Sequence, residues 1–409
     1  MTITRKDIEA AATVIQGSVV HTPTVLSPGL SRVAGMDLYL KLENLQHTGS
    51  FKVRGALNKL TSLHREETTG IIACSAGNHG QGVAYFADRL GFPATIVMPK
   101  DTPFTKIERT ERYGAKVVLE GDSLADAQAF TNDLASTEKL TFIHPYDDPH
   151  VIAGQGTIGL EMLADLPELD TIVVPVGGGG LIAGIATAAK AIKPDIRIIG
   201  VETASYPSMR DALAGRPVTA GGATLAEGIA VKTPGAHTLP IIRNLVDQII
   251  VLDELAIENA VELMADTGRL VVEGAGAVPL GAVLAEPDLF RDSVTGLVVS
   301  GGNIDMRVLA SVLLRGLVRG GQLVRLRIQI TDAPGNLAQV TQIIGKAGGN
   351  IVEIVHQRLF YDVPVKQTDI DVVIETRNAS HTAEIQDKLE GAGWPTFALS
   401  DIAASPPSS

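Results

Sequence analysis

The sequence predicts an α/β protein with a mostly parallel sheet, followed by a small α+β unit. Two observations predict this division. From residue 37 to about residue 320, short apolar strands alternate with amphipathic helices, as in parallel sheets that helices cover on both faces. Beyond residue 320 the strands alternate apolar and polar residues, which is typical of an antiparallel sheet with one buried face.

The elements of the large unit follow one another along the chain. A helical pattern over residues 5–16 ends at a Thr-Pro pair, and an alternating strand at 37–43 leads to the run Ser50-Phe51-Lys52-Val53-Arg54-Gly55-Ala56. We then expect strands at 71–74, 95–98, 116–119, 171–174, 197–201, 248–252 and 296–300. Helices are expected at 79–90, 105–113, 123–136, 180–193, 254–268 and 305–319. Ligands of such sheets bind beyond the carboxyl ends of the strands, so the loops there are the first candidates for a site.

The small unit follows a short linker at Arg319-Gly320-Gly321. Its pattern is βαββαβ. Strands are expected at 323–330, 350–358, 368–376 and 395–399, and helices at 337–347 and through Ile385 and Leu389. We therefore expect a large domain over residues 1–320, a small domain over 321–402 and a disordered tail over 403–409.

Composition narrows the class of protein. The chain has 409 residues, enough for two or three domains, and its net charge of -12 argues against nucleic acid or an anionic membrane as partner. One cysteine, Cys74, allows no internal disulfide and favours a reducing cytoplasm. No apolar run reaches membrane length, and the first residues lack the apolar stretch of a signal peptide. We expect a soluble cytoplasmic protein.

Lys52 is the residue around which the candidate site is organised. It lies between a strand and a helix, where unpaired backbone amides make the surroundings electropositive. Partial burial and the neighbouring Arg54 are expected to lower the pKa of its amine, and a neutral amine attacks carbonyl groups to form a Schiff base. The alternative is an ordinary surface lysine.

Three further loops follow strands in the way that ligand-binding loops do. Ser75-Ala76-Gly77-Asn78-His79 opens a helix and offers small residues, side-chain donors and amides to a carboxylate or phenolic oxygen, although a plain capped turn has the same pattern. Gly177-Gly178-Gly179-Gly180-Leu181 lets successive amides converge on a phosphate, and lacks the spacing of a dinucleotide fingerprint or a P-loop; a flexible hinge is the alternative. Ser300-Gly301-Gly302-Asn303 follows at the end of the last strand. Glu273 lies at another glycine-rich helix start, where its carboxylate either lines the site or complements the positive N-terminus of that helix.

Together these motifs resemble the fold-type II pyridoxal-phosphate enzymes (the tryptophan synthase β family), and among them the threonine and serine dehydratases. The resemblance covers about residues 5–320, with the motifs in order and at matching spacings. It implies that Lys52 is the Schiff-base lysine, that Asn78 bonds the phenolic oxygen of pyridoxal 5'-phosphate and that Ser300 bonds its pyridine nitrogen. Gly177 to Leu181 would hold the phosphate, and Ser75, Ala76, Gly77, Asn78 and His79 would receive the substrate carboxylate.

The small domain resembles an ACT regulatory domain, with Asp332-x-Pro-Gly-Asn-Leu as its strand-to-helix turn. One such domain on a dehydratase resembles threonine ammonia-lyases, which convert L-threonine to 2-oxobutanoate and ammonia and also deaminate serine. Amides around Gly335 and Asn336 would bind an amino-acid effector, with isoleucine or valine the natural candidates for a role in isoleucine biosynthesis. The resemblance also implies a homo-oligomer, a dimer or tetramer; an ACT unit that only oligomerises is the alternative.

Other relatives define the remaining alternatives. Serine racemases resemble this chain but carry a second serine where Ala76 stands, so racemisation is not expected. They also place a metal near a loop like residues 202–208, but Ser208 stands where a second acid is needed, so we expect no metal there and a surface position for Glu202. Two other functions remain as alternatives to threonine deamination. One is β-replacement, as in cysteine synthases, and the other is a non-catalytic amino-acid sensor.

Overall fold

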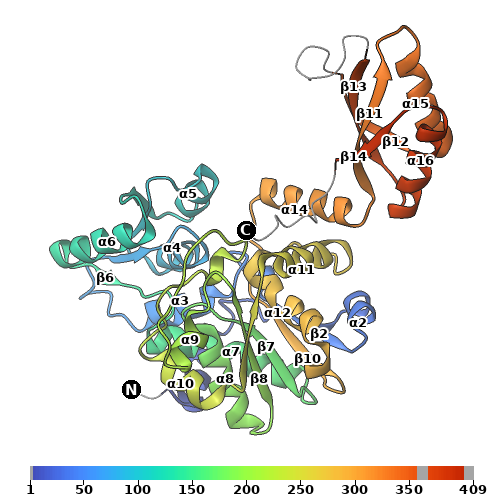
Figure 1. Ribbon diagram of the computed structural model, residues 1–409. Coiled ribbons are helices and arrows are strands. Elements are labelled where there is room, and N and C mark those ends of the chain that lie inside the picture. Colours follow the sequence, from blue (N-terminus) through green and yellow to red (C-terminus); the bar gives the residue numbers. More distant parts are fainter. Residues whose placement is uncertain (1–2, 357–366, 400–409) are drawn as a thin grey trace. The chain divides into compact units, whose positions relative to one another are not determined.

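The computed structural model describes residues 3–356 and 367–399 and divides the chain into two compact units, residues 1–304 and 305–409 (Figure 1). The sequence predicts a boundary after residue 320, whereas helix α14 (Met306–Arg319) groups with the second unit. The predicted tail at 403–409 lies outside the described residues. No helix in the described ranges has the length and apolar character needed to cross a membrane.

The first unit contains a six-stranded sheet in the order β1-β2-β10-β7-β8-β9. All neighbours in it are parallel except β1 and β2, and this confirms the prediction of a mostly parallel sheet. Helices α8 and α12 pack on it. The strands run over Thr24–Leu26 (β1), Leu38–Leu42 (β2), Thr171–Pro175 (β7), Arg197–Thr203 (β8), Gln248–Leu252 (β9) and Thr295–Val299 (β10).

A second sheet of the first unit is fully parallel and has the order β5-β4-β3-β6. Its strands are Ile71–Cys74 (β3), Ala94–Met98 (β4), Lys116–Leu119 (β5) and Thr141–Phe142 (β6). The helices of the unit are Arg5–Ile15 (α1), Pro28–Ala34 (α2), Lys52–Thr61 (α3), Asn78–Leu90 (α4), Phe104–Glu111 (α5), Leu124–Glu138 (α6), Pro149–Asp165 (α7), Gly180–Ile192 (α8), Ser208–Leu213 (α9), Thr238–Leu245 (α10), Glu254–Asp266 (α11), Gly274–Ala285 (α12) and Pro287–Phe290 (α13).

Two helices that the sequence did not predict, α7 and α12, lie in the interior of this unit. Eleven of the 17 residues of α7 are buried, and α12 contains Pro279. A helix that is buried on nearly all sides shows no amphipathic period, and its glycines argue against a helix by propensity. In α7 the glycines allow close packing: a Cβ on Gly156 would lie 2.8 Å from the carbonyl oxygen of Gly184 in α8.

The second unit has an antiparallel sheet in the order β12-β13-β11-β14, with α15 and α16 contributing to its core. This agrees with the predicted βαββαβ order. The elements are Leu323–Thr331 (β11), Asn336–Ala347 (α15), Asn350–His356 (β12), Gln367–Glu375 (β13), Ala379–Gly391 (α16) and Thr396–Ala398 (β14). Residues 357 and 358 of the predicted second strand lie outside the described residues. Apolar side chains of β11 and β13 alternate into the core, as the period of the sequence requires.

Candidate active site

The loops that follow β2 and β10 are joined by backbone hydrogen bonds. Ser50 and Gly301 form an antiparallel bridge. The amide of Phe51 donates to the carbonyl oxygen of Ser300 at 3.1 Å, and the amide of Gly302 donates to the carbonyl oxygen of Gly49 at 2.9 Å. The two strands are parallel neighbours, so both loops leave the sheet at the same edge. The structure thus brings Lys52 and Ser300, 248 positions apart in sequence (300 minus 52), to adjacent loops.

Lys52 begins helix α3 and is partly buried. Its Nζ donates a hydrogen bond to the carbonyl oxygen of Pro145 at 2.7 Å. Burial lowers the pKa of the Lys52 amine to about 8, against the opposing attraction of the Glu273 carboxylate. With this pKa about one tenth of the amine is neutral at pH 7, against less than about one thousandth for an ordinary lysine, and the neutral form is the one that a nucleophile or general base requires.

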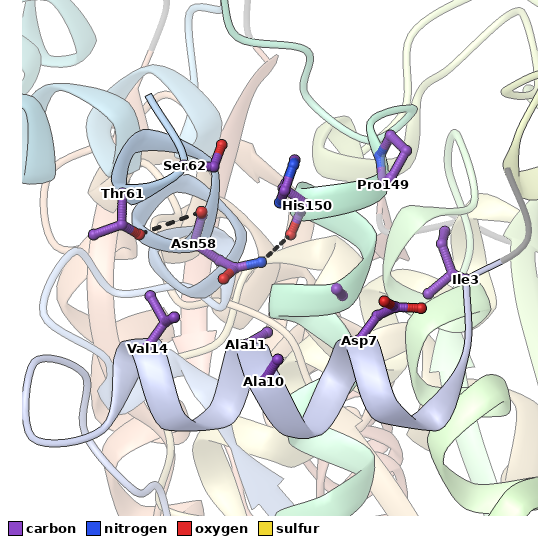
Figure 2. A pocket seen from close by; sticks show the side chains of 11 residues that line it. Ile3, Asp7, Ala10, Ala11, Val14, Asn58, Thr61, Ser62, Pro149 and His150 are labelled. Atoms are coloured by element: carbon purple, nitrogen blue, oxygen red, sulfur yellow. Dashed lines mark hydrogen bonds between the residues drawn. The ribbon is translucent and has the colours of Figure 1, made fainter. Parts of the chain in front are cut away.

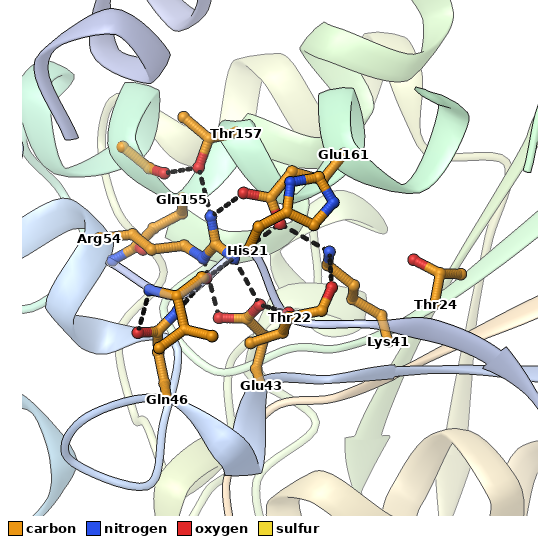
Figure 3. A network of polar contacts seen from close by, with 12 residues as sticks. His21, Thr22, Thr24, Lys41, Glu43, Gln46, Arg54, Gln155, Thr157 and Glu161 are labelled. Atoms are coloured by element: carbon orange, nitrogen blue, oxygen red, sulfur yellow. Dashed lines mark hydrogen bonds and ion pairs between the residues drawn. The ribbon is translucent and has the colours of Figure 1, made fainter. Parts of the chain in front are cut away.

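The predicted cause of that shift was partly wrong, because Arg54 does not act on Lys52. The guanidinium of Arg54 is fully buried and its charge is neutralised by two carboxylates: Nη2 lies 2.8 Å from Glu43 Oε1, and Nη1 lies 2.6 Å from Glu161 Oε1 (Figure 3). The buried amine of Lys41 also reaches Glu161, at 2.6 Å. This buried ion cluster joins α3, β2 and α7 behind the first turn of the helix that carries Lys52.

The loop after β3 places Asn78 at the first position of α4. The Nδ2 of Asn78 donates to Glu273 Oε1 at 2.7 Å, and its Oδ1 accepts a hydrogen bond from Asn303 Nδ2 at 2.7 Å. Burial raises the pKa of the Glu273 carboxyl to about 7, and the hydrogen bond from Asn78 partly offsets this rise. Glu273 therefore lines the site. It occupies the N-cap position of α12, but its side chain makes no capping hydrogen bond to that helix and accepts from Asn78 instead.

The remaining residues of this loop offer mainly backbone groups. Ser75 Oγ accepts from the amide of Gly77 at 3.2 Å. His79 is buried with its Nε2 2.8 Å from the carbonyl oxygen of Ile143, and burial together with the Lys52 charge lowers its pKa to about 3. Its ring is thus neutral and held by the protein, so His79 has its backbone amide rather than its side chain available for a ligand carboxylate.

The glycine run between β7 and α8 forms a bend in which no side chain fits. A Cβ on Gly178 would lie 2.2 Å from the ring of Tyr146, and one on Gly180 would lie 2.7 Å from the Tyr146 carbonyl oxygen. Gly179 has a φ of 95°, which glycine adopts without strain. In the described part of the chain, the amides of residues 177–181 donate no hydrogen bond, so at the start of α8 they are open to an anion.

One part of the site was missed from the sequence, namely residues 144–147. Pro145 accepts the hydrogen bond from Lys52, and Tyr146 packs against the glycine run. The Asp147 carboxylate accepts hydrogen bonds from the amides of Ala236 and His237, both at 2.8 Å, and ties this segment to the loop before α10. The segment follows β6, which has only two residues, and a strand this short cannot be predicted from an apolar pattern.

A cavity of about 430 Å³ lies apart from these residues, between α1, α3 and the start of α7 (Figure 2). Its lining includes Asp7, Val14, Asn58 and His150, but none of the side chains predicted to hold a cofactor. The candidate active site is therefore the edge of the sheets where Lys52, Asn78, Ser300 and the glycine run meet, and not this cavity.

The expected surface position of Glu202 is wrong. Glu202 is fully buried, and its carboxylate accepts hydrogen bonds from the backbone amides of Met209 and Arg210, at 2.8 and 3.0 Å. Burial raises its pKa to about 7, while these two amides act in the opposite direction. Among the described residues, no group of three or more His, Cys, Asp and Glu side chains is arranged to hold a metal ion.

Comparison with known families gives one match over most of the chain. The model of the family described as "Pyridoxal-phosphate dependent enzyme" matches residues 15–301. Two curated proteins called L-threonine ammonia-lyase are similar over nearly the full length of both chains. The one from Geobacter sulfurreducens is 45% identical over 393 residues, covering 95% of this chain and 97% of that protein. The one from Thermotoga maritima is 42% identical, covering 96% of this chain and 98% of that protein.

Solved structures agree with this match. The processed form of threonine deaminase isoform 2 from Solanum lycopersicum superposes with a TM-score of 0.71 at 38% identity, covering 75% of this chain and 90% of that one. Maize serine racemase superposes with a TM-score of 0.72 at 34% identity, covering 78% of this chain and 99% of that one. Lys52, Asn78, the glycine run and Ser300 lie within residues 15–301, which the family model matches.

Proposed function

The chain belongs to the family of pyridoxal-phosphate dependent enzymes, and we propose that it is a threonine ammonia-lyase that converts L-threonine to 2-oxobutanoate and ammonia. L-Serine, which would give pyruvate, is the second substrate we expect. The observation that supports this most is the near full-length similarity to two L-threonine ammonia-lyases. Lys52, Asn78, Ser300 and the glycine run, which lie together in this fold, supply the groups that such a reaction needs.

The residues present fit pyridoxal phosphate. The open amides of residues 177–181 suit its dianionic phosphate, because the start of α8 is electropositive and the glycines have no side chains of their own to cover these amides. The Ser300 side chain is buried, and in the described chain its hydroxyl makes no hydrogen bond, which leaves it to the pyridine nitrogen. Lys52 supplies the amine for the aldehyde carbon, and Asn78 supplies an N–H for the phenolic oxygen.

When bound, the cofactor supplies an electron sink for the Cα–H bond that breaks. The neutral amine of Lys52 takes the Cα proton, and its lowered pKa suits it to this task near neutral pH. The amides of the loop 75–79 hold the substrate carboxylate and so orient the Cα–H bond toward Lys52. A hydroxyl such as that of Ser300 does not enforce a positive charge on the ring nitrogen as a carboxylate does, and this favours prompt loss of the β-hydroxyl group.

Ala76 distinguishes this activity from racemisation. A racemase needs a second acid–base group on the face of Cα opposite to Lys52, and Ala76 has no proton to give at the position where serine racemases carry a serine. Racemisation is therefore expected to be negligible, although the fold is shared with maize serine racemase.

The proposed activity is tested by incubating the purified enzyme, loaded with pyridoxal phosphate, with L-threonine and with L-serine. We expect equimolar release of ammonia and 2-oxo acid from both. Threonine with added sulfide is expected to give the same yield, because no β-replacement occurs. D-Amino acid formation comparable to dehydration would indicate a racemase. Intact threonine after prolonged incubation would contradict the proposal.

The lowered pKa of Lys52 predicts how the apoenzyme takes up its cofactor. The neutral amine is the form that attacks the aldehyde, so the rate of uptake should rise with pH up to about 8 and level off above it. Stopped-flow absorbance of apoenzyme mixed with pyridoxal phosphate measures this rate. A rate that still increases at pH 10, as for an ordinary lysine, would contradict a site that favours the neutral amine.

For the second unit we propose an ACT-type regulatory role with isoleucine or valine as effector. The support is the turn before α15: Gly335 has a φ of 93° and precedes the helix. The amide of Asn336 donates to the carbonyl oxygen of Ala333 at 3.4 Å, whereas the next two amides, of Leu337 and Ala338, donate no hydrogen bond in the described chain. Asn336 Nδ2 donates to the carbonyl oxygen of Thr331 at 2.8 Å and holds the turn closed. Such a turn suits an amino-acid carboxylate. Feedback of this kind fits an enzyme of isoleucine biosynthesis, at work in the cytoplasm as a homo-oligomer.

A charge placed at this turn tests the effector site. Gly335→Asp puts a carboxylate at the start of α15, where it should compete with the effector carboxylate and raise the half-effective concentration at least about tenfold. Gly348→Asp is the matched control, because Gly348 also has a positive φ, 91°, but lies at the far end of the same helix. Inhibition curves with isoleucine and valine measure the effect. Equal curves for both variants and the wild type would contradict this site.

A further inference from the structure

Three side chains of the site form a continuous chain of hydrogen bonds: Asn303, Asn78 and Glu273. The Nδ2 of Asn303 donates to the carbonyl oxygen of Thr48 and to Asn78 Oδ1, both at 2.7 Å. The Nδ2 of Asn78 then donates to Glu273 Oε1, also at 2.7 Å. Asn303 ends the Ser-Gly-Gly-Asn motif, and the proposed reaction gives it no role of its own.

The donors and acceptors of this chain allow only one orientation of each amide. The carbonyl oxygen of Thr48 can only accept, so the nitrogen end of the Asn303 amide must face it. Both N–H groups of Asn303 are then used, and the second one requires the oxygen end of Asn78. A flipped Asn78 would set its NH₂ group against the NH₂ group of Asn303, and its oxygen against the carboxylate oxygen of Glu273. A donor would then face a donor and an acceptor would face an acceptor.

The far end of the chain is equally restrained. The backbone amide of Glu273 donates to the carbonyl oxygen of Gly301 at 3.1 Å, in the same loop that carries Asn303. A Cβ at Gly301 would lie 2.6 Å from Glu273 Oε1, so this carboxyl packs directly against the loop. Asn78 is thus held between two partners, one in the loop after β10 and one at the start of α12, which this backbone hydrogen bond ties together, and it has a single N–H of Nδ2 left over.

We propose that Asn303 and Glu273 are positioning residues, which hold the Asn78 amide so that its remaining N–H donates to the phenolic oxygen of bound pyridoxal phosphate. A freely rotating asparagine would present its oxygen to that phenolic oxygen part of the time and repel it. This inference rests on the cofactor placement given under the proposed function, but not on the identity of the substrate.

The substitution Asn303→Asp tests this directly, since it keeps the shape of the side chain and removes both donors. The carboxylate at position 303 would attract the NH₂ group of Asn78 and turn its oxygen toward Glu273 and the cofactor. Titration of the apoenzyme should show an affinity for pyridoxal phosphate at least about tenfold weaker, the effect of losing one hydrogen bond to a charged acceptor. The visible absorption band of the bound cofactor should also shift.

Asn58→Asp is the matched control. Asn58 is buried in α3 outside the site, and its Nδ2 donates to the carbonyl oxygen of His150 at 2.8 Å, so the same change breaks the same kind of bond. We expect a similar loss of thermal stability in both variants, and a wild-type cofactor affinity and absorption band in Asn58→Asp alone.

A second pair of variants decides the question even where Asn303→Asp does not fold. Glu273→Gln keeps an oxygen that accepts from Asn78 and should retain the wild-type absorption band. Glu273→Leu has no acceptor and should shift the band and weaken cofactor binding. Wild-type band and affinity in either Asn303→Asp or Glu273→Leu would overturn the inference. A wild-type enzyme that binds the cofactor but leaves threonine intact would refute the proposed substrate and leave this inference standing.

Discussion

Replacing Lys52 by alanine is expected to abolish the release of ammonia from threonine. The substitution removes both the amine that bonds the cofactor and the base that takes the Cα proton. Loss of a general base alone typically lowers the rate about 100- to 10,000-fold, so we expect kcat to fall by at least about 1,000-fold. Steady-state assays with excess pyridoxal phosphate measure the fall, so that weaker cofactor binding does not account for it.

Lys59→Ala is the control for this experiment. Lys59 lies two turns further along the same helix, and its amine pairs at 2.7 Å with Asp148, the N-cap residue of α7. We expect this variant to keep activity within about threefold of the wild type. A Lys52→Ala enzyme with normal steady-state turnover would refute the role that we assign to Lys52.

The second large effect is expected on stability, from Arg54→Met. This change leaves the carboxylate of Glu43, which is fully buried, without the bidentate partner that lies 2.8 and 2.9 Å away, and it takes one of two cations from Glu161. Removing one partner of a buried ion pair typically lowers the free energy of unfolding by about 3–5 kcal/mol. Because α3 begins at Lys52, cofactor binding is expected to weaken as well. Urea denaturation of the apoenzyme measures the first effect.

Arg112→Met is the matched control for this loss. The side chain of Arg112 is 70% exposed, and its ion pair with Glu108 joins adjacent turns of solvent-exposed helix. Pairs of this kind contribute less than about 1 kcal/mol, so the unfolding midpoint should hardly move. Equal losses for the two arginine variants would show that the buried ion cluster is not what holds α3 in place.

Much of the fold could be predicted because its signals are local in sequence. Buried parallel strands such as β7 are short apolar runs that end at turn residues, here the glycines from residue 177. The alternation of apolar and polar residues in β11 predicts a sheet with one covered face. The rule that ligands bind beyond the carboxyl ends of parallel strands also singled out the loops that carry Lys52 and Ser300. By contrast, α7 and α12 were missed, because helices buried on all sides lack the period on which such prediction depends.

The partners of charged residues could not be predicted, because pairing depends on tertiary contacts. The sequence places Arg54 two residues from Lys52, but a helix turns neighbouring side chains in different directions, and Arg54 points to Glu43 and Glu161 instead. The same holds for Glu202, which caps the amides of α9 from the interior, and for Asn303, whose partner Asn78 is 225 residues away. The motifs predicted which residues form the site, but not which residues hold those side chains in place.

The central claim is that pyridoxal phosphate is bound covalently through Lys52. Reduction of the freshly purified, cofactor-loaded enzyme with borohydride, followed by peptide mass spectrometry, tests it most directly. We predict one modified peptide, which spans residues 50–56 and carries the reduced cofactor on Lys52. An unmodified peptide, or a reduced adduct on another lysine such as Lys41 or Lys59, would contradict the account.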